Sequence, residues 1–279
     1  MLLADPVHVR GWRAELALQY ERRGARTVLA SRRHEGPLVV QKPLYPEGDG
    51  VCHTILIHPP GGLAGGDDLE ARAALGADSH VLLTTPAAGK WYRSLGPAAR
   101  QRVAITAGAG ACAEWLPQET ILFDGARARI ETDVRLTATA SYIGWDIVCL
   151  GRTASGERYE TGECRLHTRI ARDDRTLWLE RGAIEAGGRL ATSPAGLAGH
   201  TVFATMLATL DAARDLLDAC RSEIAEDGAT GITCPPGLFI ARYLGDSSEA
   251  ARRYFQKLWA LIRPAVTGRE AHTPRIWST

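Results

Sequence analysis

The feature that most constrains the fold is a succession of short runs of alternating apolar and polar residues, each ended by a turn signal. "VCHTILIHP" and "HVLLTTP" are rich in β-branched and aliphatic residues, and proline stops each of them. "ARIETDVRLTATASYIGWDIVCLG" places threonine and valine at alternating positions, which favours half-buried strands over helix. Turn signals recur about every ten residues, the spacing of an all-β architecture. The first two thirds of the chain are therefore predicted to be strands.

Further strands are predicted by the same criteria. "RQRVAITAGAGACAEWL" contains two runs joined by an Ala-Gly turn, and "ECRLHTRIARD" and "RTLWLERGAI" are hinged at Asp173 and Asp174. The chain has 29 glycines, more than the usual share of roughly 7%. Many stand between strands, where sharp corners need a positive φ. No repeat of a fixed period between 20 and 50 residues is evident.

The pattern changes after Gly199. Residues 200–227 place apolar side chains close to helical spacing. A second helix is predicted to begin at Asp246 as its N-cap, with Glu249 completing a capping box, and to stop at Pro264. We therefore expect one domain over residues 1–279, mainly β over 1–199, with two helices in a C-terminal part over 200–279.

Composition excludes several classes of function. With 33 basic and 32 acidic residues the net charge is +1, so no basic field attracts nucleic acid or anionic lipid. No stretch offers the roughly 18 consecutive apolar residues of a membrane span, and no secretion signal is evident. Six cysteines lie far apart without a CxxC pair, which is typical of reduced thiols. The protein is expected to be cytoplasmic, without nucleic-acid or membrane partners.

The glycine-rich stretch "HPPGGLAGGDDL" at residues 58–69 does not meet the requirements of a phosphate loop. Asp67 and Asp68 follow its glycines and would repel a phosphate. A second candidate, "TTPAAGKWYRS", has Thr84 where a Walker loop needs its first glycine and Trp91 where it needs serine or threonine. No nucleotide binding is predicted by either route.

Metal binding by the same region is predicted to be weak or transient. His53 and His58 precede the two aspartates, but their spacing places them on opposite sides of a regular strand. Acidic residues after a glycine turn are more often solvated than ligating. Glu119 and Asp124 flank a short strand and either pair across a cavity or face water; the residues alone leave both open.

Five stretches taken together resemble a known family. "HPPGGLAGGDDL", "LLTTPAAGKWYRS", "WLPQETILFDGAR", "WDIVCLGRTASGE" and "HTPRIWST" follow one another in the order seen in the urease accessory proteins of the UreD (also UreH) family. The resemblance spans the chain from about Ala30 to its last residue. Asp146 departs from the family pattern, which more often has glutamate after the tryptophan.

The resemblance implies a β-helix-like arrangement of many short strands with two helices near the C-terminus. It implies a non-catalytic scaffold of urease maturation that binds the urease apoprotein, recruits the helical partner UreF and, through UreF, the GTPase UreG. No cofactor is expected to be tightly bound, and nickel is expected only as transient cargo. Because nickel(II) accepts oxygen and imidazole ligands, a loose set of carboxylates and hydroxyls suits its passage.

The family's motif loops supply the candidate site residues. The predicted lining of a polar internal passage comprises Asp67, Thr84, Thr85, Ser94, Glu119, Asp124 and Glu163. Asp67 is predicted to point into this passage and Asp68 to solvent or to a backbone amide. The predicted structural loop residues are Gly61, Gly62, Gly65 and Gly66, which allow tight turns, with Lys90 and Arg93, which are expected to form internal ion pairs.

Trp259, Arg275 and Trp277 are candidates for partner binding, because tryptophan and arginine are enriched at binding hot spots. Packing of the two tryptophans in the chain's own core is the alternative. Two other functions remain open at this stage. One is a β-helix hydrolase with Glu119 and Asp124 as its acid–base pair. The other is a pure adaptor that holds its partners without any metal passage.

Overall fold

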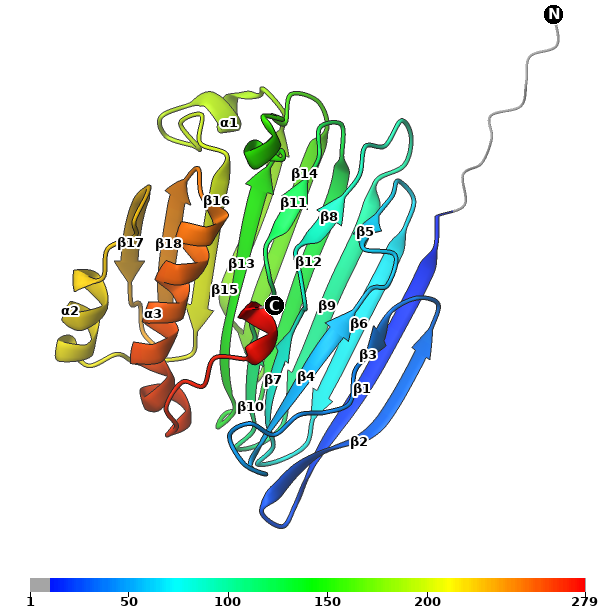
Figure 1. Ribbon diagram of the computed structural model, residues 1–279. Coiled ribbons are helices and arrows are strands. Elements are labelled where there is room, and N and C mark those ends of the chain that lie inside the picture. The colour runs from blue at the N-terminus through cyan, green and yellow to red at the C-terminus, as the bar shows by residue number, and fades with distance from the viewer. Residues whose placement is uncertain (1–10, 279) are drawn as a thin grey trace, which may run out of the picture.

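The computed structural model describes residues 11–278 and shows a β-solenoid of about four turns. The chain winds so that successive coils add strands to two facing sheets (Figure 1). The seven-stranded sheet has the order β15-β14-β12-β9-β6-β1-β2. Its strands are β1 (Arg13–Arg23), β2 (Arg26–Glu35), β6 (Asp68–Leu75), β9 (Ala99–Ala107), β12 (Arg127–Leu136), β14 (Glu163–Arg172) and β15 (Arg175–Glu185).

The second sheet has eleven strands, and its main path has the order β17-β18-β16-β13-β10-β7-β4-β3. These strands are β3 (Val39–Val40), β4 (Val51–Ile57), β7 (His80–Thr84), β10 (Cys112–Trp115), β13 (Ser141–Leu150), β16 (Val202–Ala208), β17 (Ala229–Thr233) and β18 (Phe239–Gly245). Three short strands pair off this path: β5 (Gly62–Leu63), β8 (Gly89–Trp91) and β11 (Thr120–Leu122). The predicted β-helix-like arrangement is confirmed.

The coils of the solenoid differ in length. Val51 is paired with His80, His80 with Cys112, and Cys112 with Ser141, all in parallel register. Successive coils are therefore 29, 32 and 29 residues apart. This variation explains why the sequence shows no repeat of fixed period although the structure repeats.

A hydrophobic core fills the space between the two sheets. In β1 every second side chain, from Ala14 to Tyr20, points inward and is at most 2% exposed. This period of two is what a pleated strand with one buried face requires. The intervening residues of β1 face solvent, and the same alternation recurs in β12. The strands predicted from alternation in the sequence are thus confirmed.

A second core lies on the outer face of the eleven-stranded sheet, beneath α3 (Ser248–Thr267). Tyr254, Phe255 and Leu258 of α3 are at most 2% exposed. Figure 1 shows α3 lying across this sheet, with the C-terminal segment folded over its middle strands. Two shorter helices, α1 (Arg189–Thr192) and α2 (Arg214–Ser222), and the 3₁₀ turns η1 (Thr153–Ser155) and η2 (Arg275–Ser278) complete the described elements.

The prediction of helix over residues 200–227 was wrong in its first part, because Val202–Ala208 forms strand β16 and only Arg214–Ser222 is helical. Both faces of β16 are covered, by the inner core and by α3. A short strand buried on both sides has a continuous apolar run, which periodicity cannot distinguish from a helix.

Both predicted ends of the last helix also need correction. Ser247 is the N-cap and accepts a hydrogen bond from the Ala250 amide at 3.1 Å, whereas Asp246 accepts one from the Thr201 amide. Pro264 lies inside the helix, which ends at Gly268 with φ of +69°. A proline removes one donor from the last turn without ending the helix there, and glycine supplies the left-handed stop.

Candidate functional site

The motif loops of successive coils stack on one another along one side of the solenoid, where the strands end. The Tyr92 amide donates to Leu63 at 2.8 Å, the Phe123 amide to Trp91 at 3.0 Å, and the Gly151 amide to Leu122 at 2.8 Å. Each coil thus returns to this end directly beside the previous one. Stretches that are about 30 residues apart in the sequence become neighbours, and we call residues 58–67, 92–98 and 123–127 the motif-loop end.

Asp67 stabilises the turn of the opening stretch. Its two carboxylate oxygens accept hydrogen bonds from the Ala64 amide at 2.7 Å and the Trp12 amide at 2.8 Å, and the residue is 8% exposed. Asp68 lies at the surface, 3.6 Å from Arg100. Asp67 therefore binds two backbone amides, whereas Asp68, predicted to point to solvent or to a backbone amide, has a side chain that is 50% exposed.

Glycines are required in this turn for two reasons. Gly61 and Gly66 have φ of +77° and +92°, a region that side chains disfavour. Gly62 and Gly65 are needed because neighbours approach closely: a Cβ at Gly65 would lie 2.0 Å from Ser94 Oγ. The turn and the 92–98 loop are thus in direct contact.

Internal ion pairs were predicted for Arg93 and Lys90; Arg93 forms an ion pair, but at the surface with a 61% exposed side chain, and Lys90 forms none within residues 11–278. Arg93 lies 2.9 Å from Asp124, whose other oxygen accepts the amides of Glu160 and Thr161. Partial burial acts to raise the pKa of Asp124, but these hydrogen bonds lower it to about 2. Lys90 is exposed and forms no ion pair with any residue from 11 to 278.

The other predicted passage residues lie in several different places. Thr85 lines a cavity between the sheets. Thr84 is on the outer face, where it donates to the Leu116 carbonyl at 2.6 Å. Ser94 bonds within its own loop, to the Pro97 carbonyl. Glu119 is 3.4 Å from Arg252, and Glu163 is 2.7 Å from Arg127.

The C-terminal candidates fold back on the chain itself. Trp259 is 1% exposed, and the ring of the half-buried Trp277 lies 5.8 Å from it and 5.6 Å from that of Trp145. Trp277 Nε1 also donates to Thr84 Oγ1 at 2.8 Å. Arg275 is exposed. Trp259 is thus packed in the chain's own core, as the alternative prediction has it. Arg275 is accessible to a partner without any rearrangement.

A buried cluster of charged groups attaches α3 to the outer face of the sheet. We call Glu47, His53, His80, Glu114 and Arg263 the clamp. Arg263 contacts Glu47 at 2.6 Å and Glu114 at 2.9 Å, while His80 Nε2 lies 2.7 Å from Glu114 and His53 Nε2 lies 2.6 Å from Glu47. Arg263 and Glu114 are 0% exposed.

The clamp shifts the pKa values of its members. Complete burial alone would raise the pKa of Glu114, but His80 and Arg263 lower it to about 2. Burial alone would lower the pKa of His80, yet Cys112 and Glu114 beside it raise it to about 10. Both residues are charged at neutral pH, so the clamp is a fully paired structural network.

Two cavities lie between the sheets. The larger, of about 330 Å³, is mainly apolar, and both ring nitrogens of His58 are buried there without a hydrogen-bond partner. Burial lowers the pKa of His58, so its imidazole is neutral. As its spacing predicted, His58 lies on the opposite side of the sheet from His53, which is in the clamp.

The smaller cavity, of about 40 Å³, has room for a few water molecules. Its polar lining comprises Asp146 on β13, Thr168 on β14, Glu180 on β15 and Thr205 on β16. Burial, and secondarily Glu180, raises the pKa of Asp146 to about 6. Trp115, which lines the larger cavity, is paired in register with Gly144, which lines the smaller one. The two cavities are therefore on neighbouring strands.

In the sequence, Asp146 is marked only by its departure from a family pattern, and no pattern marks Glu180. Asp146 interrupts the apolar strand "YIGWDIVCL", and that interruption was the available signal. Glu180 lies on a hairpin strand with mixed exposure, so nothing in its surroundings in the sequence indicated that it faces inward.

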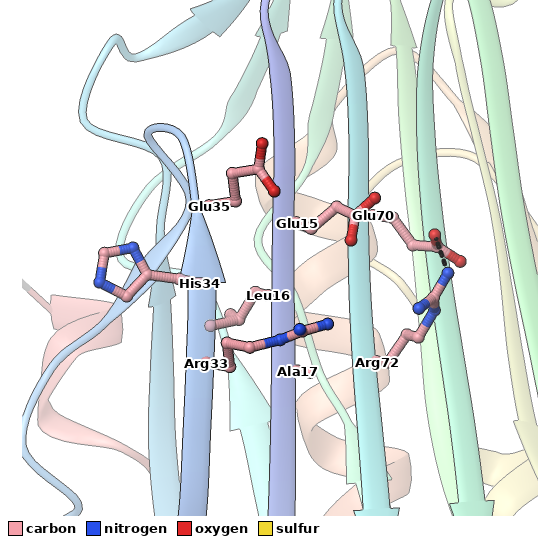
Figure 2. Close-up of a pocket in the computed structure, with 8 residues that line it drawn as sticks. All are labelled: Glu15, Leu16, Ala17, Arg33, His34, Glu35, Glu70 and Arg72. Carbon is pink, nitrogen blue, oxygen red and sulfur yellow. Dashed lines mark hydrogen bonds and ion pairs between the residues drawn. The ribbon is translucent and has the colours of Figure 1, made fainter.

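A charged pocket on the outer face of the seven-stranded sheet shows a different arrangement (Figure 2). Glu35, Glu15 and Glu70 are neighbours in register across β2, β1 and β6. Glu15 pairs with Arg13 and Glu70 with Arg72, each at 2.5 Å. The arginines of these pairs are exposed to solvent, so each pair contributes little to stability.

Within residues 11–278 there is no group of three or more histidine, cysteine, aspartate or glutamate side chains placed to hold a metal ion together. No helix in that range is long and apolar enough to cross a membrane. The unpartnered polar groups that face the cavities are therefore individual potential metal ligands and do not form a preassembled metal site.

Comparison with known proteins agrees with the resemblance of the motifs. The family model described as UreD urease accessory protein matches residues 13–278. A urease accessory protein UreD from Dechloromonas aromatica (strain RCB) is 55% identical, over 99% of this chain and 98% of its own length. Similar proteins of the same description occur in Azoarcus sp. (strain BH72), at 55% identity over 96% and 95% of the two chains, and in Pseudomonas aeruginosa (strain PAO1), at 50% over 96% and 95%.

Proposed function

The chain belongs to the UreD family of urease accessory proteins, which are non-catalytic maturation factors, and from this premise we propose that it acts both as a scaffold and as a conduit for nickel. In this proposal it binds the urease apoprotein, recruits UreF and, through UreF, UreG. Nickel then passes through the interior between the two sheets. The hydrolase alternative is excluded by the family, and Glu119 and Asp124 each pair with an arginine.

The observation that carries the proposed passage is the unsatisfied polar lining of the interior. Both ring nitrogens of His58 are buried without a hydrogen-bond partner, and the partly exposed Asp146 carboxylate receives no hydrogen bond from any residue from 11 to 278. Buried polar groups are normally paired, so an unpaired one indicates water, an ion or a ligand at that place. Both groups face cavities on neighbouring strands.

The chemistry of these groups suits nickel as cargo. Nickel(II) accepts imidazole and carboxylate ligands, and His58 and Asp146 offer one of each. Because they are single donors with water to complete the coordination shell, each would hold the ion weakly enough for release. The passage we propose therefore runs by His58, Thr85, Thr205, Asp146 and Glu180.

The proposed conduit is tested by Asp146→Ala in cells that express the urease and its accessory proteins. We expect urease activation to fall about tenfold, while the complex with the partners is retained in pull-downs. Asp68→Ala, which removes a surface carboxylate, is the matched control and should activate normally. Full activation by the Asp146 variant, with its complex intact, would instead favour a pure adaptor.

For the scaffold we propose the motif-loop end as a docking surface. Leu95 at its tip is 97% exposed and Tyr92 beside it is 39% exposed. Hydrogen bonds from the Ser94 amide to Gly125 and from Arg127 to the Gly96 carbonyl hold the loop in place. A rigid loop that displays an exposed apolar side chain loses little entropy on binding.

The scaffold proposal is tested by Leu95→Asp, with co-purification of the urease apoprotein and of UreF measured separately. We expect at least one of the two complexes to be lost while the circular dichroism spectrum is unchanged. Ile224→Asp, a substitution of another exposed apolar residue (76% exposed) beyond α2, is the control. Retention of both complexes by the Leu95 variant would place the docking surface elsewhere.

A further inference from the structure

The smaller cavity lies at the place where one sheet ends and the other continues. The seven-stranded sheet ends at β15, whereas the eleven-stranded sheet continues from β16 through β18 to β17. Asp146, Thr205 and Arg242 are neighbours in register on β13, β16 and β18. Asp146 and Thr205 line the cavity, and Arg242 is one strand further toward the open edge.

Arg242 reaches across this edge to the opposite sheet. Its Nη2 lies 3.0 Å from Glu180 Oε1 on β15, and its Nη1 lies 3.3 Å from Thr205 Oγ1. Its guanidinium carbon is 5.6 Å from the centre of the Trp178 ring. The side chain is 50% exposed. The guanidinium therefore bridges two residues of the cavity lining at the solvent side of the cavity.

We propose that Arg242 is a gate on this cavity, closed when its guanidinium binds Glu180 and open when it turns out to solvent. The inference rests on the proposed nickel passage. A divalent cation and the guanidinium compete for the same carboxylate, so Glu180 becomes available to the ion only when Arg242 leaves. The competition also keeps nickel affinity low, which a conduit needs for release.

The exposure of Arg242 suits a reversible contact. A half-exposed ion pair contributes little free energy, because water competes for both partners. Arg263 in the clamp is the opposite case: it is 0% exposed and held by two carboxylates, so it is fixed. Arg242 has solvent on one side and a single carboxylate partner.

The test measures nickel binding to the untagged full chain by equilibrium dialysis. Arg242→Gln is expected to lower the dissociation constant about fivefold, which corresponds to about 1 kcal/mol. In the double variant Arg242→Gln with Glu180→Gln the gain should disappear. Arg253→Gln is the matched control, since Arg253 is similarly exposed (41%) and pairs with glutamates away from the cavity.

Two results would overturn the gate: an unchanged or higher dissociation constant for Arg242→Gln, or a gain that persists when Glu180 is also replaced. If Asp146→Ala weakens nickel binding but Arg242→Gln leaves it unchanged, the gate is wrong and the proposed passage is retained. If neither the wild type nor any variant binds nickel, the proposed passage fails and the gate with it. Circular dichroism checks the fold of each variant.

Discussion

An acid with a shifted pKa lies on each side of the eleven-stranded sheet: Glu114 is 0% exposed on the outer side, and Asp146 is partly exposed in the smaller cavity on the inner side. On the outer side, Glu114 is held by His80, Arg263 and Trp259 Nε1, the last at 2.7 Å. On the inner side, Asp146 receives no hydrogen bond from the part of the chain that the structure describes. The pKa is lowered to about 2 for Glu114 and raised to about 6 for Asp146.

This difference separates an acid that holds the fold together from one that the fold leaves available. A buried charge with matched partners fixes the position of the elements that supply them, here α3 against the solenoid. A buried charge without partners costs stability, and a fold retains it where water or a ligand uses it. The two acids differ both in exposure and in their partners, and the partners decide whether the pKa is lowered or raised.

The largest effect is expected from Glu114→Gln. Removing this charge leaves His80 without a carboxylate partner and Arg263 with Glu47 alone, and breaking a buried pair in this way costs about 3–5 kcal/mol. Urea unfolding at pH 7 measures this loss in the free energy of unfolding. Glu249→Gln, which removes a surface partner of Arg253, should cost well below 1 kcal/mol. Equal losses in the two variants would remove the distinction between clamp and surface.

Because of the clamp, the free energy of unfolding should fall in two pH ranges, an acid arm and an alkaline arm. The pKa of Glu114 is lowered to about 2, so its contribution is present above its ordinary value near 4.5 and is lost as the pH falls toward 2. The pKa of His80 is raised to about 10, so its contribution is present below 6.5 and is lost as the pH rises through 10. The loss at acid pH is on the order of 3 kcal/mol and the loss at alkaline pH on the order of 5 kcal/mol.

Urea unfolding of the wild type between pH 2 and 10 measures both arms. In His80→Gln the alkaline arm should disappear and the stability at neutral pH should already be reduced. If the variant loses as much stability at alkaline pH as the wild type does, groups other than His80 cause that loss.

A smaller effect of opposite sign is expected from Asp146→Asn. Because the folded-state pKa of Asp146 is raised to about 6, its ionised form destabilises the protein as the pH rises through that value. The asparagine variant should be more stable by about 1–2 kcal/mol at pH 8 and no more stable than the wild type at pH 4. A loss of stability at pH 8 would mean that Asp146 has a structural partner after all.

The strands were predictable because their alternation reports on one element at a time. A half-buried strand shows its period of two without reference to its neighbours, and the hairpin at Asp173 and Asp174 is marked by its own turn residues. The secondary-structure prediction was wrong where the tertiary environment of a segment, and not its own pattern, determined whether it forms a strand or a helix. The run from Val202 to Ala208 has an apolar pattern that is compatible with a helix. It forms a strand because α3 and the inner core cover its two faces.

The sequence by itself determined the alternating strands, the glycine turns at Gly61 and Gly66, and the family. Only the tertiary structure decided which charges meet: Glu47, Glu114 and Arg263 come from three distant segments, as do Asp146, Glu180 and Arg242. Whether a carboxylate becomes a structural partner or an open ligand depends on what lies within a few ångströms of it. Electrostatic and hydrogen-bonding energies fall off steeply with distance, and the spacing of residues along the chain does not determine their distance in space.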